Sequence, residues 1–412
     1  MTKARLCTTR SAGRDLWRSR QFRRAPFLFL AGLTSLLPGC RPHDFPDYPA
    51  NYREYAYVTN GGSNSVTVLD VVNVRQDRTI PVGAGPTGVA VNPRRNEVYV
   101  VNTGSNSVSV IDAEKNRVVA QIAVHRRPSS ISVSQDGTRG YVANSGSNNV
   151  SVLDLGERRE IAAIGVGESP EVAAVSPDGN TVVVSNRASG SVSLVDTKSL
   201  RVRSVWSGCP GATDIAVLPD SNKAFVACSG GHQVMALSLA KPANTATRRR
   251  RIDADSARAD SLLALLDVGT TPVNLALKPD GGEIFAVNYG SGSVSEIDTS
   301  TNEVGAAYLI GTHPVRGVVS ADNATLYVSN LDADSLGVFS IDDAQLVGAA
   351  PTGDGPKAMA LSKAGHLLFA VDTRTGDVAV VRTLTHTLFT MLPAGRSPND
   401  IAVKAFNLQS RR

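Results

Sequence analysis

The chain has few of the residues that carry most enzyme chemistry. Its 412 residues include 4 cysteines, 6 histidines, 4 methionines and 2 tryptophans. The sequence contains no CxxC pair, no GxSxG or HExxH stretch, and no glycine-rich loop that leads into a helix. These absences exclude the short motifs of haem attachment, serine-hydrolase nucleophiles, zinc proteases and nucleotide phosphate binding. We therefore predict no catalytic residues and no metal site.

The chain has no excess of positive charge outside the first 39 residues. The formal net charge is +5, but residues 1–39 hold eight of the 42 basic residues and one of the 37 acids. The rest of the chain has 34 basic against 36 acidic residues and is slightly acidic. Because this part of the chain has no net positive charge to attract a polyanion, nucleic acid is not an expected partner.

Long apolar runs are absent as well. The one apolar block, PFLFLAGLTSLLPGC at residues 26–40, is too short to span a bilayer as a helix. Because a basic stretch precedes it, residues 1–39 are predicted to be an export signal. The end of the block, LLPGC, resembles the lipobox of bacterial lipoproteins. This resemblance implies a lipid-modified Cys40 that anchors an exported protein on the periplasmic or cell-surface side of a membrane.

The same segment leaves two alternatives open. Arg23 and Arg24 lie just ahead of the apolar block, which is compatible with a twin-arginine export route. A cytoplasmic protein with a disordered N-terminal tail is the alternative to export. Residues 40–55 are rich in proline and show no hydrophobic period, so we predict a tether between the lipid and the folded domain.

The chain is rich in repetition. The phrase YVTNGGSNSVTVLD at residues 57–70 returns as YVVNTGSNSVSVID at 99–112 and YVANSGSNNVSVLD at 141–154. Its first position recurs every 42 residues, apart from one gap of 60 that locates an insertion at residues 241–261. The residues at this position are Tyr57, Tyr99, Tyr141, Val183, Phe225, Phe285, Tyr327 and Phe369.

Each period contains four segments that alternate or run apolar as β-strands do. Pro-Asp-Gly and Asn/Gly turns separate them. Four antiparallel strands in about 42 residues make one blade of a β-propeller. An aspartate that ends the third strand is expected to accept the backbone N–H bonds of the following turn. This aspartate is Asp112, Asp154, Asp196 or Asp298 in four of the periods.

We therefore predict an all-β propeller over residues 56–405, with a C-terminal tail at 406–412. The chain opens at a second strand, at Tyr57, and ends with an unmatched first strand at residues 399–404. Pairing between these two ends would complete a composite blade and close a ring of eight. Seven blades with one irregular terminal segment is the alternative.

The YVTN, YVVN and YVAN phrases, each followed by an NxVxVID-like stretch, resemble the YVTN family of bacterial and archaeal envelope β-propellers, also called YncE-like. The resemblance covers residues 57 to about 404. It implies the propeller fold and an envelope location. It says little about function, because the ligands of such proteins are poorly defined.

A propeller carries the loops before its first strands and after its second strands on one face around the channel, which is the expected binding face. Two residues after a recurring proline, polar residues break a pattern of small neutral ones. Either ion pairing of the acids with the arginine across the channel mouth or ligand contact would explain them. They are Asp214, Asn274, Arg316 and Asp400. Further candidates on this face, whose basic members suit an anionic ligand or an acidic partner, are His125, Arg126, Arg127, His313 and Lys357.

Cysteines replace two repeat residues in one unit. Cys209 takes a glycine position and Cys228 takes the asparagine position of the Tyr-Val-x-Asn phrase. The first and second strands are antiparallel, so the two positions should be neighbours. We predict a disulfide in an oxidising compartment, with two free thiols as the alternative. The charged insertion at 241–261 should be a solvated loop on the face opposite the rim, with protein docking as the alternative.

The predicted function is a non-catalytic, monomeric binding or protein-interaction platform of the cell envelope, without a cofactor and attached to the membrane only through its lipid. Eight blades also resemble the haem d1 propellers of nitrite reductases and their maturation relatives. This resemblance implies tetrapyrrole binding as an alternative, through His125, His313 and neighbouring arginines. A propeller lactonase or lyase is the third alternative.

Overall fold

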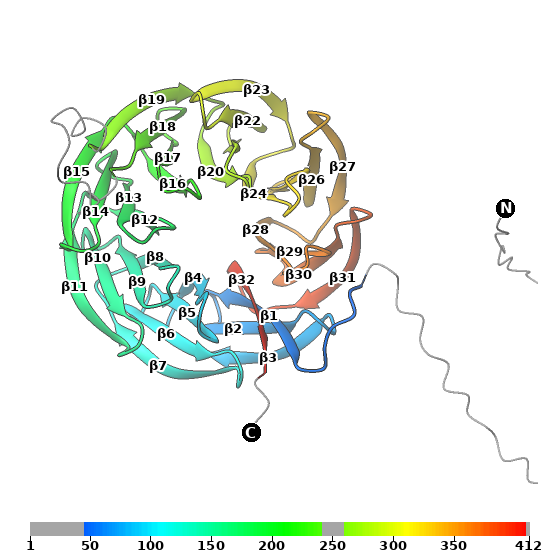
Figure 1. The fold of residues 1–412 in the computed structure, drawn as a ribbon. Coiled ribbons are helices and arrows are strands. Elements are labelled where there is room, and N and C mark those ends of the chain that lie inside the picture. Colours follow the sequence, from blue (N-terminus) through cyan, green and yellow to red (C-terminus); the bar gives the residue numbers. More distant parts are fainter. Residues whose placement is uncertain (1–44, 241–258, 409–412) are drawn as a thin grey trace, which may run out of the picture. The chain divides into compact units, whose positions relative to one another are not determined.

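The structure is a computed structural model, which describes residues 45–240 and 259–408. These residues form eight four-stranded antiparallel sheets arranged radially in a ring (Figure 1). The prediction of an eight-bladed β-propeller is confirmed, and the seven-bladed alternative is wrong. The predicted export signal, Cys40 and most of the insertion lie outside the described residues. In the part of the chain that is described, no helix is long and apolar enough to cross a membrane.

The blades are numbered from the composite one, and each has four strands from the channel outward. The inner strands of blades 1 to 8 are β32 (Pro398–Asn407), β4 (Pro86–Val91), β8 (Pro128–Val133), β12 (Pro170–Val175), β16 (Ala212–Val217), β20 (Pro272–Leu277), β24 (Pro314–Val319) and β28 (Pro356–Leu361). The second strands are β1 (Tyr52–Asn60), β5 (Glu97–Asn102), β9 (Arg139–Asn144), β13 (Thr181–Asn186), β17 (Lys223–Cys228), β21 (Glu283–Asn288), β25 (Thr325–Asn330) and β29 (Leu367–Asp372). The third strands are β2 (Ser65–Asp70), β6 (Ser107–Asp112), β10 (Asn149–Asp154), β14 (Ser191–Asp196), β18 (Gln233–Ser238), β22 (Ser293–Asp298), β26 (Ser335–Ser340) and β30 (Asp377–Arg382). The outer strands are β3 (Arg75–Pro81), β7 (Arg117–Ala123), β11 (Arg159–Gly165), β15 (Arg201–Ser207), β19 (Ser261–Asp267), β23 (Glu303–Leu309), β27 (Gln345–Pro351) and β31 (Thr387–Pro393).

The core lies between the blades. Eight clusters of buried hydrophobic side chains fill the eight seams of the ring. In one of them Val66 and Val68 of blade 1 pack with Val98 and Val100 of blade 2. The second and third strands are buried almost throughout because neighbouring blades cover both of their faces. A single blade would leave these faces in water, so the ring supplies the burial that the repeat needs.

Blade 1 joins the two ends of the described chain. Strand β32 pairs with β1 from Tyr52 opposite Asn407 to Asn60 opposite Pro398. Both strands are longer than their counterparts in the other blades, at 10 and 9 residues. Strand β1 therefore begins inside the segment predicted as a tether, and β32 continues into the predicted tail. Pairing with the partner strand extends both, because each satisfies the other's backbone groups.

The turns follow the chemistry that the sequence indicates. The Oδ1 atom of Asp112 accepts the N–H groups of Glu114 and Lys115 at 2.9 and 3.1 Å, which is an Asx-turn. The equivalent aspartates in three other blades make the same kind of bond, so this prediction is confirmed.

Candidate functional site

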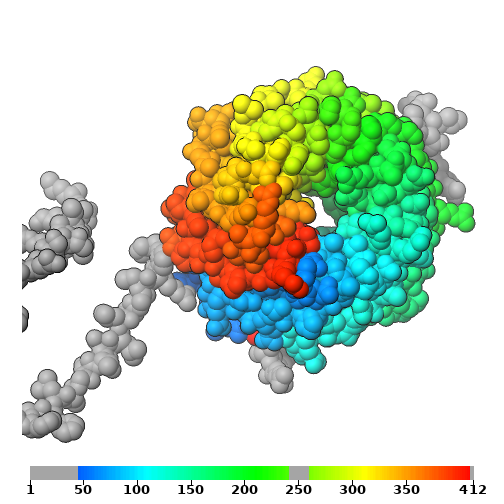
Figure 2. All heavy atoms as spheres, turned by 180° about the vertical axis from the view of Figure 1, so that it is seen from behind, coloured from blue at the N-terminus to red at the C-terminus, as the bar shows by residue number. Residues whose placement is uncertain are grey.

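Two sets of loops form one face of the ring. Gly61, in a loop after a second strand, donates to the carbonyl of Ser397, in a loop before an inner strand, at 3.0 Å. Thr103 makes the equivalent contact in blade 2, with the carbonyl of Gly85 at 3.1 Å. We call this the rim face, and the side with the other two sets of turns the opposite face. The inner strands surround an opening that runs through the ring (Figure 2).

In blade 1 the asparagine of the Tyr-Val-x-Asn phrase joins the two sets of rim loops. The amide of Asn60 is fully buried, donates to Ser65 and Thr67, and accepts the N–H of Gly395 at 2.9 Å. A Cβ on Gly395 would lie 2.6 Å from Cγ of Asn60, so only glycine fits there. The asparagines at this position in blades 2, 3, 4, 6 and 7 are buried as well, so burial keeps them from a ligand, although their Oδ1 atoms lack the hydrogen bond that Asn60 accepts.

Three of the four polar residues that break the inner-strand pattern tie one blade to the next. Oδ2 of Asp214 accepts the amide of Asn274 at 2.5 Å and the N–H of Leu275 at 2.9 Å. Asn274 in turn accepts the N–H of Gly317 at 2.8 Å, and Asp400 accepts the N–H of Val89 at 3.1 Å. Inner strands are sheet edges whose free N–H groups need acceptors, and these side chains supply them.

Neither acid forms an ion pair with Arg316 in the described part of the chain, so the expected pairing across the channel mouth does not occur. Arg316 and Lys357 are instead the only exposed side chains among the sixteen that follow the eight proline positions by one or two residues. Ser329 Oγ lies 2.8 Å from the carbonyl of Lys357 and 3.4 Å from that of Arg316, which places them on adjacent inner strands. Neither forms an ion pair within the described residues. We call the two residues the cation pair.

The candidate histidines do not meet. His125 of blade 3 lies 3.4 Å from Glu160 in the outer strand β11, away from the channel. His313 of blade 7 bonds through Nδ1 to Asp332, and its ring stacks on Tyr289 with centroids 4.4 Å apart. The described residues contain no group of three or more His, Cys, Asp or Glu side chains that could hold a metal ion.

A chain of ion pairs extends from His313 across blades 7 and 8. Arg374 bonds to Asp332 and, at 2.9 Å, to Asp354. Arg374 and His313 together lower the pKa of Asp332. The charge of Arg374 is therefore balanced by the two aspartates that it contacts. Because these ion pairs are exposed to solvent, they contribute little to the stability of the fold. Arg126 and Arg127 are exposed on blade 3, across the ring from the cation pair.

A buried carboxyl on this face was not singled out by the sequence analysis. Asp372 takes the asparagine position in blade 8 and is fully buried. Its Oδ2 accepts the N–H of Gly353 at 3.0 Å, and burial together with the nearby Asp377 raises its pKa to about 8. The signal was present in the sequence, because Asp372 and Asp377 replace the Asn and Ser of the repeat.

Cys209 and Cys228 form a disulfide with Cα atoms 4.7 Å apart. Both are fully buried in the seam between blades 4 and 5. The bond joins the loop before β16 to the end of β17, where six of the other blades place a glycine against the side chain of an asparagine or of Asp372. In blade 5 the disulfide therefore replaces this non-covalent contact by a covalent bond.

The end of the charged insertion is fastened to the neighbouring blade. Asp260 is bonded by the guanidinium of Arg203 at 2.7 Å, by the hydroxyl of Ser204 and by the N–H of Ala240. These hydrogen bonds outweigh the effect of burial and lower the pKa of Asp260. Residues 241–258, with the four arginines, lie outside the described residues, and the expected docking role stays a prediction.

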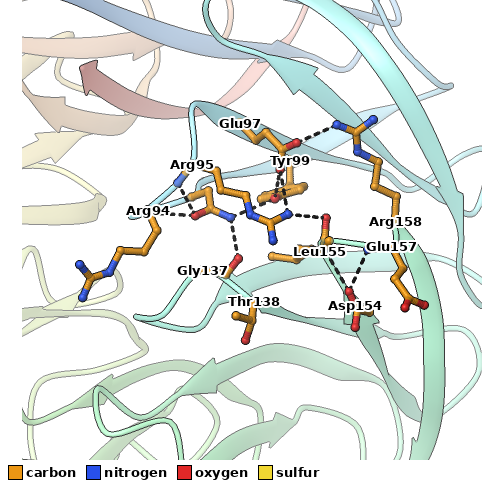
Figure 3. Close-up of polar contacts among 12 residues, drawn as sticks. Arg94, Arg95, Glu97, Tyr99, Gly137, Thr138, Asp154, Leu155, Glu157 and Arg158 are labelled. Carbon is orange, nitrogen blue, oxygen red and sulfur yellow. Dashed lines mark hydrogen bonds and ion pairs between the residues drawn. The ribbon is translucent and has the colours of Figure 1, made fainter. Parts of the chain in front are cut away.

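Arginines on the opposite face belong to a structural network (Figure 3). Glu97 accepts the hydroxyl of Tyr99 at 2.7 Å and the guanidinium of Arg158 at 2.9 Å. Arg95 donates to the carbonyl of Leu155, and Asn92 donates to Tyr99. Burial and the bond to Glu97 raise the pKa of Tyr99. This network joins the turns of blades 2 and 3. It contrasts with the cation pair, for which residues 45–240 and 259–408 supply no acidic partner.

Comparisons with known proteins agree with the architecture. Residues 39–178 match the YncE-like β-propeller family, and residues 312–388 match the seven-bladed β-propeller lactonases. No curated protein matches the sequence. Dihydro-haem d1 dehydrogenase NirN in complex with DHE has a TM-score of 0.68 at 16% identity, covering 90% of this chain and 78% of that chain. Apo AztD from Citrobacter koseri has 0.66 at 15%, covering 86% and 98%, and Kuenenia stuttgartiensis hydrazine synthase has 0.54 at 21%, covering 79% and 92%. At these identities the likeness concerns the fold alone.

Proposed function

Because the chain is a β-propeller with YncE-like repeats, we propose that it is a non-catalytic binding platform of the cell envelope, anchored through a lipid on Cys40. Its partner is an envelope protein that presents an acidic segment to the channel mouth. The observation that carries this proposal is the cation pair of Arg316 and Lys357, exposed and without an ion pair among the described residues. Unneutralised cations side by side at a channel mouth attract carboxylates.

The acids on the same face support a binding role over a catalytic one. Asp214 and Asp400 each accept a backbone N–H bond from the next blade through Oδ2, so one oxygen of each acid is engaged in holding the ring together. A general base must instead reach a substrate proton. A propeller lactonase or lyase would therefore need acids or bases other than these two.

The proposal predicts that reversing the charge of the cation pair abolishes capture of the partner. We would crosslink cells mildly and compare the adducts of the wild-type chain with those of the Arg316→Glu, Lys357→Glu variant. Replacing two charge-assisted contacts by repulsion should reduce the adduct by about 10- to 100-fold. The readout is the amount of crosslinked partner per protein, quantified by mass spectrometry.

The matched control carries the same charge change on exposed residues of blade 4 near the opposite face, Lys198→Glu with Arg201→Glu. It should capture the partner as the wild type does. Equal loss in both variants, or no loss in the rim variant, contradicts an acidic partner at this mouth.

A further inference from the structure

The described chain reaches the ring at blade 8. The Phe45 ring lies 5.4 Å from the ring of Phe389 in β31 and 5.5 Å from that of His366, between centroids. The Tyr48 hydroxyl is 3.3 Å from Nε2 of His366, and its ring stacks on Tyr52 at the start of β1. In Figure 1 the blue start of the chain accordingly lies beside β31. The segment before β1 is thus packed on the ring from Phe45 onward, where a free tether was predicted.

These contacts lie on the opposite face. His366 belongs to the hairpin between β28 and β29, and its carbonyl accepts the N–H of Thr383 at 3.2 Å. Thr383 opens the turn between the third and outer strands of blade 8. Both connections are on the side of the ring away from the rim loops, and the chain therefore meets the ring at the edge farthest from the cation pair's face.

The surface around this point is apolar and exposed. Leu384, in the turn that Thr383 opens, is 76% exposed, and Phe389 is 38% exposed. The Arg382 guanidinium lies 4.4 Å from the ring centroid of Phe389, and Lys363 is exposed in the neighbouring hairpin. One acid, Asp47, is exposed on the same segment. Aromatic rings, an exposed leucine and cations are the side chains that proteins place at the surface of a bilayer.

The sequence distance to the proposed anchor is short. Residues 41–44 alone separate Cys40 from Phe45. Five Cα-to-Cα steps span at most about 18 Å even when fully extended. A lipid on Cys40 therefore holds Phe45 and its neighbours close to the lipid headgroups. The rim face lies a further strand length away, about 20 Å for six residues.

We propose that the surface formed by Phe45, Tyr48, Leu384 and Phe389, the anchor patch, lies against the bilayer that holds Cys40, so that the rim face with its cation pair is directed away from the membrane. This inference rests on the lipid anchor of the proposed function. It adds the orientation: the acidic partner approaches from the aqueous side, and the membrane does not cover the channel mouth.

Depth-dependent fluorescence quenching tests the orientation. The mature lipid-modified protein, from which residues 1–39 with Cys7 have been removed, would be reconstituted into phosphatidylethanolamine and phosphatidylglycerol vesicles that contain a headgroup-proximal spin-labelled lipid. A fluorophore is attached through Leu384→Cys in one preparation and through Ala84→Cys, on an exposed rim loop, in the other. Cys209 and Cys228 are bonded to each other and do not react. We expect quenching at position 384 several-fold stronger than at position 84.

Each outcome decides the inference. Equal quenching at the two positions, or stronger quenching at 84, overturns the orientation while leaving the lipid anchor intact. Flotation of the vesicles reports the anchor separately. If the wild-type chain does not float with the vesicles, the lipid anchor in the proposed function fails and the orientation falls with it. If it floats and Cys40→Ala does not, the anchor stands, and the ratio of quenching decides the orientation.

Discussion

At the scale of single residues, Asp372 stands at a position where six other blades have an asparagine, so a carboxyl group has to replace the hydrogen-bond donor of an amide. In blade 3 the buried Asn144 donates from Nδ2 to Oδ1 of Asn149 at 2.9 Å. Blade 8 has Asp372 and Asp377 at these two positions, and two ionised carboxylates cannot share this arrangement. A proton on Asp372 supplies the missing donor, which agrees with the raised pKa of this residue.

This proton predicts that Asp372→Asn removes a loss of stability that the wild type shows as the pH rises from about 4 to about 8. The folded-state pKa is raised to about 8, so the carboxyl stabilises the fold fully below its unfolded pKa of roughly 4 and progressively less as pH rises toward 8. The amide keeps its donor at every pH. We expect the variant to be more stable than the wild type by about 1–3 kcal/mol at pH 9. Urea unfolding between pH 5 and 9 measures the difference.

Asp298→Asn is the control for that experiment. The Ser300 hydroxyl and backbone N–H groups lower the pKa of Asp298 to about 2, so its charge does not change above pH 5. Its stability curve should therefore run parallel to that of the wild type. A parallel curve for Asp372→Asn as well would show that Asp372 is already ionised in the folded chain.

At the scale of elements, β32 decides whether the ring closes. It pairs with β1 along its length and contacts the inner strands of both neighbouring blades. Its side chains Ile401 and Phe406 belong to the buried clusters on the two sides of blade 1. Without β32, the edge of β1 and both seams are open to water, and an open β-edge pairs with other chains.

A chain that ends after Ser397 is therefore expected to aggregate or to lose cooperative unfolding. A synthetic peptide of residues 398–412, added during refolding, should restore a soluble ring because the missing strand pairs through β1. Circular dichroism and size-exclusion chromatography follow the rescue. The control peptide carries Ile401→Asp and should not rescue. A truncated chain that is fully stable by itself would contradict closure by β32.

At the scale of the whole molecule, eight similar blades carry a rim that is not eightfold. The cation pair lies on blades 7 and 8, the disulfide joins loop and strand in blade 5, and Arg126 and Arg127 lie on blade 3. Binding on such a ring is directional, because a partner that contacts one pair of blades meets different side chains elsewhere. This asymmetry favours a partner segment that docks on one side of the rim over a ligand centred on the channel, because a centred ligand would meet the cation pair on one side only.

The same asymmetry predicts that the protein isolated from native membranes is colourless. Ligation of a tetrapyrrole by two histidines would need His125 and His313 to converge, but they lie on blades 3 and 7, and each ring contacts a carboxylate, Glu160 or Asp332. We therefore expect no Soret band in the ultraviolet-visible spectrum. A Soret band that is lost in the His313→Ala variant but kept in His125→Ala would establish a tetrapyrrole role and overturn the binding-platform proposal.

The sequence by itself determined the blade. A period of 42 residues, strand alternation within it and turn residues between the strands are local patterns, and each is written in consecutive residues. The composite blade followed from the same register, because the chain starts at a second strand and ends at a first. The neighbouring positions of Cys209 and Cys228 also followed from strand order.

Only the tertiary structure decided which polar groups are free. Asp214 meets Asn274 60 residues away, Asp400 meets Val89 across the closure, and Phe45 packs on Phe389. Such contacts join different blades. The repeat does not predict them, because it describes what the blades share and these contacts depend on residues that differ between blades. The ring brings specific side chains together at its seams, so that among the described residues Arg316 and Lys357 have no ion pair, and the carboxyl of Asp372 is protonated beside Asp377.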